Sequence, residues 1–515
     1  MKRRSAPAPV VVAKPRRERP PKVAPPSTDA LLPDHLEWVE AWGMESKSMS
    51  YVFRPSTLDQ LKEVFVRARS AGRTIALKGG GRSYGDAFQN SEEFVLDLSR
   101  MNRVLDWNPE TGILVAEPGL RIAELWRYII GDGYWPPVVS GTMFTTMGGC
   151  ASMNIHGKNA YDAGPFGNFI TEFEILLPSG ELRTVTRESD RELFHAAISG
   201  FGMLGVFTKI TLKMKRIYSG NLEVTPRYVR NFDEMIEAFD ENEHRMDYMV
   251  GWCDCFANGR GNVGRGEMHF ARHLQPGEDR MLAQTLRVKN QDLPDLLMGF
   301  IPKSILHKLM IPFVNNTGMR LINSAKWNAR LKPGASKPYL QSHAAFAFLL
   351  DYIPEWKQTY RPGGLIQYQS FVPADKAAKI FTQQIRLSHR RGIIPYLSVT
   401  KKHKRDDFLI SHGVDGFSLA LDYPVTAANK ANLWKLCHEM DELVLAAGGR
   451  FYFAKDSTMR QGTPARYLGA EAVRRFEALK AACDPENILC TALYRRLFGE
   501  PKQAENLLSN KVASL

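Results

Sequence analysis

Residues 79–90 form a glycine-rich stretch whose backbone and side chains could bind an anion and a flat ring. Three adjacent glycines follow the short apolar run of residues 74–77, which is typical of a buried strand that ends in a sharp turn. Because glycine has no Cβ, successive backbone N–H groups can converge on a phosphate. The residues of this stretch that we predict to bind such a ligand are Gly79, Gly80, Gly81, Arg82, Ser83, Tyr84, Gly85, Gln89 and Asn90. For the glycines alone, a glycine-rich surface turn remains the alternative.

A second stretch of the same kind, residues 140–152, is rich in small residues and hydroxyl donors and leads into His156. Neither stretch has the spacing of a P-loop, and no G-x-G-x-x-G sequence opens an apolar helix. Two such loops could hold one dinucleotide from both sides. In this region the predicted ligand-binding residues are Gly141, Thr142, Thr146, Gly148, Gly149, Cys150, Ile155 and Gly157.

The order of these motifs resembles that of flavoproteins of the vanillyl-alcohol-oxidase type, whose PCMH-type domain holds FAD between two such loops. The likeness runs from about residue 42 to residue 497. The segments that carry it are residues 81–86, 155–159, 166–168, 367–369 and 454–457. The resemblance implies an α+β fold: a PCMH-type FAD-binding domain, built from the N-terminal part and a returning C-terminal segment, with an inserted α+β substrate domain. It also implies that Val206 and Tyr452 contact FAD.

Within this family the likeness is to oxidases of polyprenyl-phosphate sugars. It implies an FAD-dependent oxidoreductase that oxidises the 2′-hydroxyl of a polyprenylphosphoryl-β-D-ribose to the 2′-keto sugar. A short-chain NAD(P)H-dependent reductase would then complete the epimerisation to the arabinose form, an arabinan precursor of the cell envelope. One alternative is an aldonolactone or sugar-alcohol oxidase of the same fold that acts on a soluble sugar. A basic binding protein or inactive scaffold is the second.

Oxidation of an alcohol by a flavin requires a group that takes the hydroxyl proton and a positive charge near the flavin ring. By resemblance, Lys455 is the catalytic candidate for both, and the alternative is a surface lysine paired with Asp456. His156 is the second catalytic candidate, because it is the titratable group beside the second loop. It contacts flavin or substrate, or it braces the loop through a backbone carbonyl.

The candidate substrate-binding residues are Lys158, Gln367, Gln369, Lys401 and Ser418. Alternation along a strand places Gln367 and Gln369 on one face, where their amides could meet sugar hydroxyls. Lys158 and Lys401 could bind the substrate phosphate, or they could be solvated cations. Ser418 stands where relatives carry an amide side chain, and Ala420 where mycobacterial-type members carry a reactive cysteine.

For two further side chains of the first loop we predict packing or structural roles. Tyr84 packs on the flavin or the sugar, or else within the core, and Asp86 orders the turn. Many relatives attach FAD through a histidine in this loop. Here the sequence reads Gly81-Arg82-Ser83, so we expect noncovalent FAD.

Hydrophobic periodicity predicts the elements that must position these residues. Apolar residues at helical spacing predict helices over residues 58–71 and 122–130. Short apolar segments predict strands over residues 74–77, 94–98, 104–107, 113–116, 173–177, 181–185, 205–214, 364–371, 394–401 and 417–422.

A chain of 515 residues exceeds one ordinary core, so two or three domains are expected. Residues 1–33 are basic and rich in proline, which predicts a disordered tail. We assign residues 34–216 to the FAD-binding domain and residues 217–449, which lack paired glycine loops, to the substrate-binding domain. Residues 450–515 rejoin the FAD domain by resemblance.

The formal net charge of +13 indicates an acidic partner, such as a phosphorylated substrate or an anionic lipid. Because no basic-aromatic motif is present, we expect no nucleic-acid partner. The six cysteines lack zinc-site spacing, so we expect reduced thiols, no metal and a cytoplasmic location.

Residues 296–311 are unusually apolar, but Pro302 interrupts the run, which is too short to span a bilayer. One interpretation is a core segment. The other is a surface that docks against lipid, where Lys303, His307 and Lys308 would meet anionic headgroups. The second interpretation predicts a peripheral contact with the inner face of a membrane.

Overall fold

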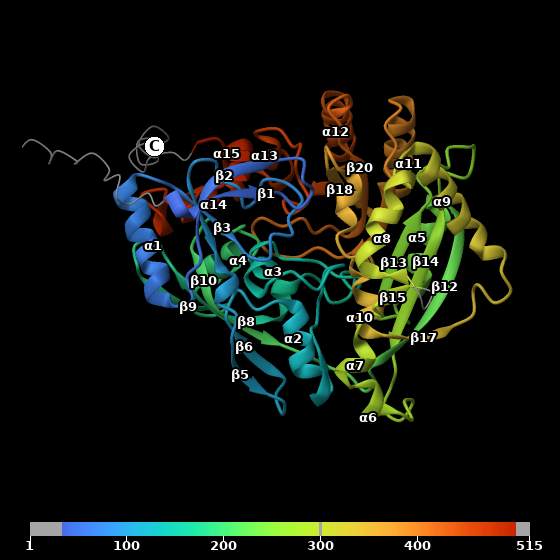
Figure 1. Cartoon of the computed structure of the whole chain (residues 1–515), viewed down its shortest axis with the longest axis horizontal. Helices are drawn as coiled ribbons and strands as arrows, with labels where there is room; N and C mark the ends of the chain where they lie inside the picture. The colour runs from blue at the N-terminus through green and yellow to red at the C-terminus, as the bar shows by residue number, and fades with distance from the viewer. Residues whose placement is uncertain (1–32, 298–300, 501–515) are drawn as a thin grey trace, which may run out of the picture.

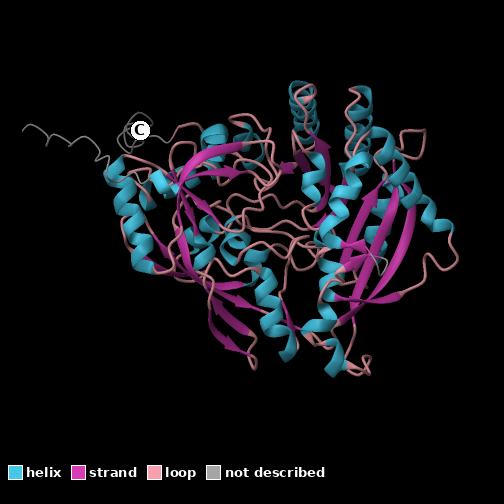
Figure 2. Cartoon of the chain, in the orientation of Figure 1, coloured by secondary structure: helices cyan, strands magenta, loops and turns pink. Residues whose placement is uncertain are grey.

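The computed structural model describes residues 33–297 and 301–500, and it combines helices with three main sheets (Figure 1). Sheets of the N-terminal half lie at one side of the molecule and an eight-stranded sheet lies at the other. Much of the chain between them is loop (Figure 2). The mixture of α and β structure expected from the sequence is confirmed. The predicted tail lies outside the described residues, apart from Pro33.

The first glycine-rich loop directly follows β3, a strand of a small four-stranded sheet with the order β1-β2-β4-β3. Its elements are β1 (Leu36–Glu40), β2 (Lys47–Phe53), α1 (Leu58–Ala71), β3 (Ile75–Lys78) and β4 (Phe94–Asp97). Helix α1 begins where the Thr57 hydroxyl accepts from the Gln60 amide, and it ends at Gly72, whose φ of 62° lies in the left-handed region. The predicted helix over residues 58–71 is confirmed. Strand β3 then points the glycine loop toward the centre of the molecule.

A five-stranded sheet with the order β5-β6-β10-β8-β9 follows. Its strands are β5 (Val104–Asn108), β6 (Ile113–Ala116), β8 (Ile170–Leu176), β9 (Leu182–Thr186) and β10 (Val206–Lys213). The other elements of this region are α2 (Ile122–Ile129), β7 (Tyr134–Trp135), α3 (Met147–Ser152), α4 (Arg191–Ala197) and β11 (Lys215–Arg216). The strands predicted over residues 173–177 and 181–185 are confirmed as β8 and β9, which pair antiparallel.

The second glycine-rich stretch differs from the loop that the sequence predicts, because part of it is the short helix α3. The Thr146 hydroxyl caps this helix by accepting from the Gly149 amide, at 3.4 Å. The amides of Met147 and Gly148 donate to the carbonyls of Leu120 and Pro118.

The third sheet is antiparallel, with the order β17-β12-β14-β13-β19-β20-β18-β21. Its strands are β12 (Asn221–Asn231), β13 (Tyr248–Cys253), β14 (Gly264–His273), β17 (Tyr339–Ser342), β18 (Leu365–Pro373), β19 (Leu397–His403), β20 (Gly416–Pro424) and β21 (Arg450–Phe451). Helices α5 (Phe232–Asn242), α11 (Ala374–Arg390) and α12 (Lys430–Ala446) pack against these strands. Alternate residues of β18, β19 and β20 point instead toward the glycine loops.

A long excursion of short elements joins β14 to β18. It contains α6 (Leu282–Thr285), α7 (Val288–Gln291), β15 (Leu296–Leu297), β16 (Ile301–Pro302), α8 (Lys303–Met310), α9 (Asn316–Asn328) and α10 (His343–Ala347). The predicted apolar stretch of residues 296–311 falls here, and residues 298–300 of it lie outside the described part. The core interpretation is wrong for Ile305, Leu309 and Ile311, whose side chains are exposed. No helix in the described residues is long and apolar enough to cross a membrane.

After β21 the chain returns to the first sheet, where Figure 1 shows its last helices beside β1 and β2. These helices are α13 (Thr463–Leu468), α14 (Ala470–Cys483) and α15 (Ala492–Phe498). The Cys490 amide donates to the Ile75 carbonyl at 2.9 Å. The Arg496 guanidinium forms ion pairs of 2.8 Å with Asp86 and Asp456. Asp86 therefore anchors the turn of the first loop to the C-terminal segment.

Candidate functional site

The two glycine-rich stretches meet across one cavity, although about sixty residues separate them in the sequence. A Cβ on Gly79 would lie 2.3 Å from the Thr146 Oγ1, and a Cβ on Gly80 would lie 2.4 Å from the Phe144 carbonyl oxygen. Only residues without a side chain allow this approach. Gly81 has a φ of 60°, which also favours glycine.

The facing loops leave unpaired donors around the cavity. No described residue accepts a hydrogen bond from the backbone amides of residues 79–83, nor from those of residues 141, 142, 145 and 146. Buried or half-buried amides without acceptors are costly, so such a set indicates an anionic ligand that completes it. The residues present thus fit a dinucleotide phosphate.

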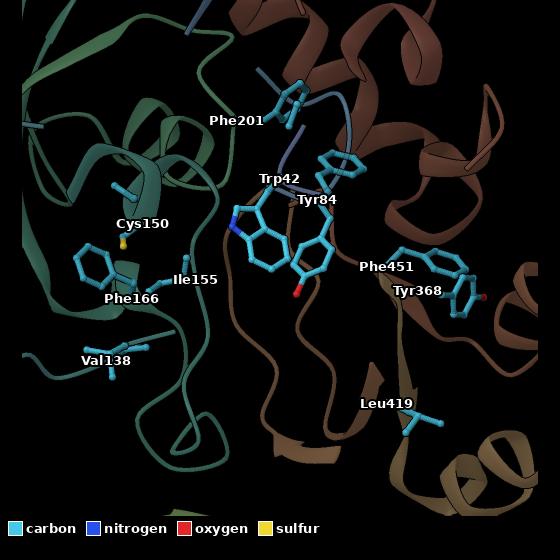
Figure 3. Close-up of a cluster of buried hydrophobic side chains, with 14 of the residues drawn as sticks. Trp42, Tyr84, Val138, Cys150, Ile155, Phe166, Phe201, Tyr368, Leu419 and Phe451 are labelled. Carbon is cyan, nitrogen blue, oxygen red and sulfur yellow. The ribbon is translucent and has the colours of Figure 1, made fainter. Parts of the chain in front are cut away.

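Tyr84 forms a wall of the cavity beside the loop. Its amide donates to the Ala454 carbonyl at 2.9 Å, which ties the first loop to the segment that carries Lys455. The Trp42 and Tyr84 rings lie side by side, with centroids 4.7 Å apart (Figure 3). The Lys455 Nζ lies 4.0 Å from the Tyr84 ring centroid, a cation–π contact.

Lys455 lies in the cavity wall near one buried acid, Asp422 of β20. Asp422 Oδ1 accepts a 2.5 Å hydrogen bond from the Gln367 amide, which also approaches the Tyr84 hydroxyl at 3.3 Å. Burial lowers the pKa of Lys455 to about 7, Asp422 opposes this shift, and Lys401 reinforces it. Burial likewise raises the pKa of Asp422 to about 7, against the hydrogen bond from Gln367 and the charge of Lys455. The predicted alternative for Lys455, a surface lysine paired with Asp456, is wrong, because Asp456 pairs with Arg496.

His156 is buried between side chains of the large sheet. Its Nδ1 lies 3.4 Å from the Lys401 Nζ, and its Nε2 lies 3.2 Å from the Gln369 amide. Burial lowers its pKa well below the ordinary histidine value, and Lys401 lowers it further, so the ring is neutral and accepts from the Lys401 ammonium. No backbone carbonyl of the described residues accepts from this ring. Two more histidines, His403 and His412, pack against it.

Lys401 and Lys158 add two further amines to the cavity wall. Burial lowers the pKa of Lys401 to about 8, so the amine is mostly charged at neutral pH. Lys158 donates to the Phe346 carbonyl and lies over the Phe346 ring. Burial lowers the pKa of Lys158 well below the ordinary lysine value, with a smaller contribution from Lys401. Neither amine pairs with a carboxylate among the described residues.

Most of the predicted site residues line this one cavity. They are Gly79, Gly80, Gly81, Arg82, Ser83, Tyr84, Gly141, Thr142, Thr146, Gly148, Gly149, Ile155, His156, Lys158, Gln367, Gln369, Lys401, Ser418, Tyr452 and Lys455. Ala420 lies on the wall between Ser418 and Asp422.

The remaining predicted residues lie behind the wall: Gly85, Gln89, Asn90, Cys150, Gly157 and Val206. A Cβ on Gly85 would meet the Asp456 carbonyl oxygen at 2.2 Å, and Gln89 donates to the carbonyls of Val39 and Ser46. Cys150 has a buried, free thiol and lies near Phe166 (Figure 3). These residues support the loops, and their contact with the cofactor stays a prediction.

Sequence reasoning missed Asp422, His403, His412 and Trp42. The two-residue period from Ser418 along β20 reaches Asp422, and the same period from Lys401 along β19 reaches His403. That alternation was the available signal. Nothing in the sequence links His412 or Trp42 to this site. Within the described residues, no group of three or more His, Cys, Asp or Glu side chains could hold a metal ion.

Comparison with known proteins agrees with this geometry. Residues 49–186, which contain both loops, match a family described as FAD binding domain. A decaprenylphosphoryl-beta-D-ribose oxidase of Mycolicibacterium smegmatis is 28% identical over 478 residues, 90% of this chain and 98% of that protein. A putative D-arabinono-1,4-lactone oxidase of Neurospora crassa is 22% identical, over 88% of this chain and 84% of that protein. A D-arabinono-1,4-lactone oxidase of Yarrowia lipolytica is 26% identical, over 39% of this chain and 38% of that protein. The cofactor of this protein is FAD, and the unpaired amides of the cavity fit its phosphates.

The contact between the loops predicts the effect of Gly80→Ala. The new methyl group would force the loops apart, at a cost of about 2 kcal/mol, or roughly a 30-fold rise in the Kd for FAD. The flavin content of the purified protein and a fluorescence titration of the apoprotein would measure this. Gly131→Ala is the control, because no heavy atom lies within 4 Å of a Cβ there. An unchanged Kd in Gly80→Ala would contradict the assignment of the loops.

Asp422→Asn tests the electrostatic link to Lys455. Asp422 raises the pKa of Lys455, so its removal should lower that pKa by about one unit. Lys455 would then lose its proton at lower pH than in the wild type. The pH dependence of Lys455 acylation, read by mass spectrometry, measures this shift without relying on activity. Asp441→Asn is the matched control, since Asp441 is a buried acid that bonds to the Tyr368 hydroxyl instead. Equal profiles for both variants would disprove the link.

Proposed function

We propose that this chain, an FAD-dependent oxidoreductase of the PCMH-type flavoproteins, oxidises the 2′-hydroxyl of a polyprenylphosphoryl-β-D-ribose to the 2′-keto sugar. The observation that carries the proposal is a set of three lysines, Lys158, Lys401 and Lys455, that pair with no carboxylate of the described residues and line the same cavity as the glycine loops. The fourth lysine of the cavity wall, Lys78, pairs with Asp97. Asp422 is the acid whose charge acts on Lys455, and Lys401 is mostly charged at neutral pH, so the wall suits an anionic substrate. The likeness to the mycobacterial oxidase along nearly its whole length supports the same substrate.

The cavity also has an apolar part that suits a lipid. Its wall there includes Trp135, Leu222, Tyr248, Val250, Phe346 and Leu350. The amine of Lys158 lies at this part, over the Phe346 ring. A phosphate between Lys158 and Lys401 would therefore have the sugar on the side of the glutamines and the prenyl chain on the apolar side.

The chemistry follows from the positions of the polar side chains. FAD, when bound, supplies the acceptor for the carbon-bound hydrogen and its electron pair. Lys455, in its neutral form, takes the hydroxyl proton, and a pKa near 7 makes that form available at neutral pH. In its charged form Lys455 stabilises developing negative charge on the oxygen.

Gln367 and Gln369 orient the sugar through their amides, as alternation along β18 places both on the cavity side. The His403 ring lies 2.8 Å from the Ser418 hydroxyl, which in turn lies 3.4 Å from the Gln369 amide. The same Gln369 amide nitrogen lies 3.2 Å from the Nε2 of His156. We infer that His156 acts mainly by positioning Gln369 and Lys401. Residues 81–83 contain no histidine, which supports noncovalent FAD.

The organisation of the enzyme belongs to the same proposal. We assign FAD binding to residues 34–216 and 450–515 and substrate binding to residues 217–449. The 2′-keto product requires reduction, for which a short-chain NAD(P)H-dependent reductase is the proposed partner. The six free, buried cysteines suit a reducing cytoplasm, with the enzyme at the inner face of the membrane.

Substrate comparison tests the proposal against the second candidate, a sugar-lactone oxidase, which the likeness to the arabinonolactone oxidases favours. Anaerobic loss of flavin absorbance would be followed with polyprenylphosphoryl ribose, free ribose and arabinono-1,4-lactone. We expect the second-order rate constant of flavin reduction by the lipid-phosphate sugar to exceed that for the others by at least about 100-fold, because remote binding energy accelerates the reaction. Faster reduction by the lactone would replace the proposal with the second candidate.

Lys455→Ala should slow this reduction by about 10²- to 10⁴-fold, because a proton acceptor beside the substrate is lost. Lys402→Ala is the control: Lys402 neighbours Lys401 on β19 but pairs with Asp240 at 2.6 Å. Wild-type reduction kinetics in Lys455→Ala would remove Lys455 from the mechanism.

A further inference from the structure

Exposed apolar side chains gather in one part of the chain, residues 302–349. This 48-residue segment holds 10 of the 21 large hydrophobic side chains that are exposed among the described residues. They are Ile305, Leu309, Ile311, Phe313, Leu321, Ile322, Leu331, Tyr339, Leu340 and Leu349. Leu331 is 71% exposed and Leu321 is 65% exposed, so these side chains are not partly buried residues at the edge of the hydrophobic core. A concentration of this kind marks a surface that meets a partner.

Local structure explains how the segment presents these side chains. In α8, Ile305 and Leu309 are four residues apart and share the outer face, whereas Leu306 is buried beneath. The 3-10 helix η6 (Ile311–Phe313) continues that helix with two more exposed apolar residues. Helix α9 buries Trp327 and exposes Leu321 and Ile322. Strand β17, with Tyr339 and Leu340, is an edge of the large sheet.

The charges of the same segment have one sign. Residues 302–349 contain no Asp or Glu, although the composition of the chain would place about five there. They contain seven cations, namely Lys303, Lys308, Arg320, Lys326, Arg330, Lys332 and Lys337. Lys308, Arg320 and Lys332 are exposed. A protein partner of mixed charge does not require such a composition, whereas an anionic lipid surface selects for it.

The same segment also contributes apolar side chains to the cavity wall. Helix α10 and the 3-10 helix η8 (Leu349–Tyr352) supply Phe346, Ala347, Leu349 and Leu350 to the cavity wall. Leu349 is also 47% exposed. The apolar side of the cavity therefore reaches the surface at Leu349, a residue of the same segment.

We propose that residues 302–349 dock on an anionic bilayer, with their aliphatic and aromatic side chains in the interface and their cations against the headgroups. The mouth of the cavity beside Leu349 then faces the acyl region. A substrate with a prenyl tail can enter it without crossing water, a consequence that rests on the proposed function. Docking itself depends only on the surface.

Vesicle sedimentation with the FAD-loaded full chain tests the charge of this surface. We expect binding to phosphatidylglycerol-containing vesicles at low salt, weaker binding at high salt, and little binding to pure phosphatidylcholine vesicles. The double variant Lys308→Glu/Lys332→Glu should bind at least about tenfold more weakly than the wild type. Lys379→Glu/Lys435→Glu has the same net charge, changes exposed lysines of α11 and α12, and should bind as the wild type does. An equal loss of vesicle binding in both double variants would show that only the net charge of the protein matters, and it would overturn the proposal.

A second pair of variants tests the apolar side chains. Leu309→Ser/Phe313→Ser should weaken vesicle binding at least about tenfold, whereas Val66→Ser/Tyr128→Ser, which removes exposed apolar groups elsewhere, should not. Retained flavin and an unchanged unfolding temperature show that the variants are folded. Wild-type vesicle binding by Leu309→Ser/Phe313→Ser overturns the proposal. The proposal is also overturned if the wild type is a dimer that does not bind vesicles and this variant is a monomer. In that case the surface joins two copies of the chain.

Activity on a short-chain, water-soluble polyprenylphosphoryl ribose separates the two proposals. Activity without vesicle binding in the wild type refutes the docking alone. Vesicle binding without activity refutes the proposed function alone.

Discussion

The site depends on a contact that only glycine permits, the approach of residues 79 and 80 to Thr146 and Phe144. A side chain at either position would force the two loops apart and weaken the site that they form. Their closure leaves a row of backbone amides without acceptors, which the cofactor phosphates can complete. The molecule places these loops by anchoring the first one from behind. Asp86 pairs with Arg496, and Ile75 bonds to the chain at Ile488 and Cys490.

That anchoring also brings Lys455, the proposed proton acceptor, to the cavity that the loops line. The Tyr84 amide donates to the Ala454 carbonyl, so a backbone hydrogen bond joins the first loop to the segment that carries Lys455. The large sheet contributes Asp422 and Gln367 from adjacent strands. The glycine loop, the proposed proton acceptor and the proposed substrate-binding strands thus come from three segments that are distant in the sequence.

The second constraint is electrostatic. Lys158, Lys401 and Lys455 lie in one cavity, and burial lowers the pKa of each amine. Such an arrangement is unfavourable in the absence of an anion, since charged groups lose hydration without a matched partner. The proposed phosphorylated substrate would offset that cost, and its binding would be favoured for the same reason. Neutral histidines around Lys401 avoid adding further charge.

The sequence by itself determined the features that depend on neighbouring residues. Periodicity identified the helix of residues 58–71, alternation put Gln367 and Gln369 on one face, and adjacent glycines located both loops. Only the tertiary structure decided which loop amides stay unpaired, since those of Met147 and Gly148 find the carbonyls of Leu120 and Pro118. It also decided that Ile305 and Leu309 are exposed and that Asp422 lies near Lys455. Each of these outcomes depends on which distant segment packs alongside, and a local pattern carries no information about that neighbour.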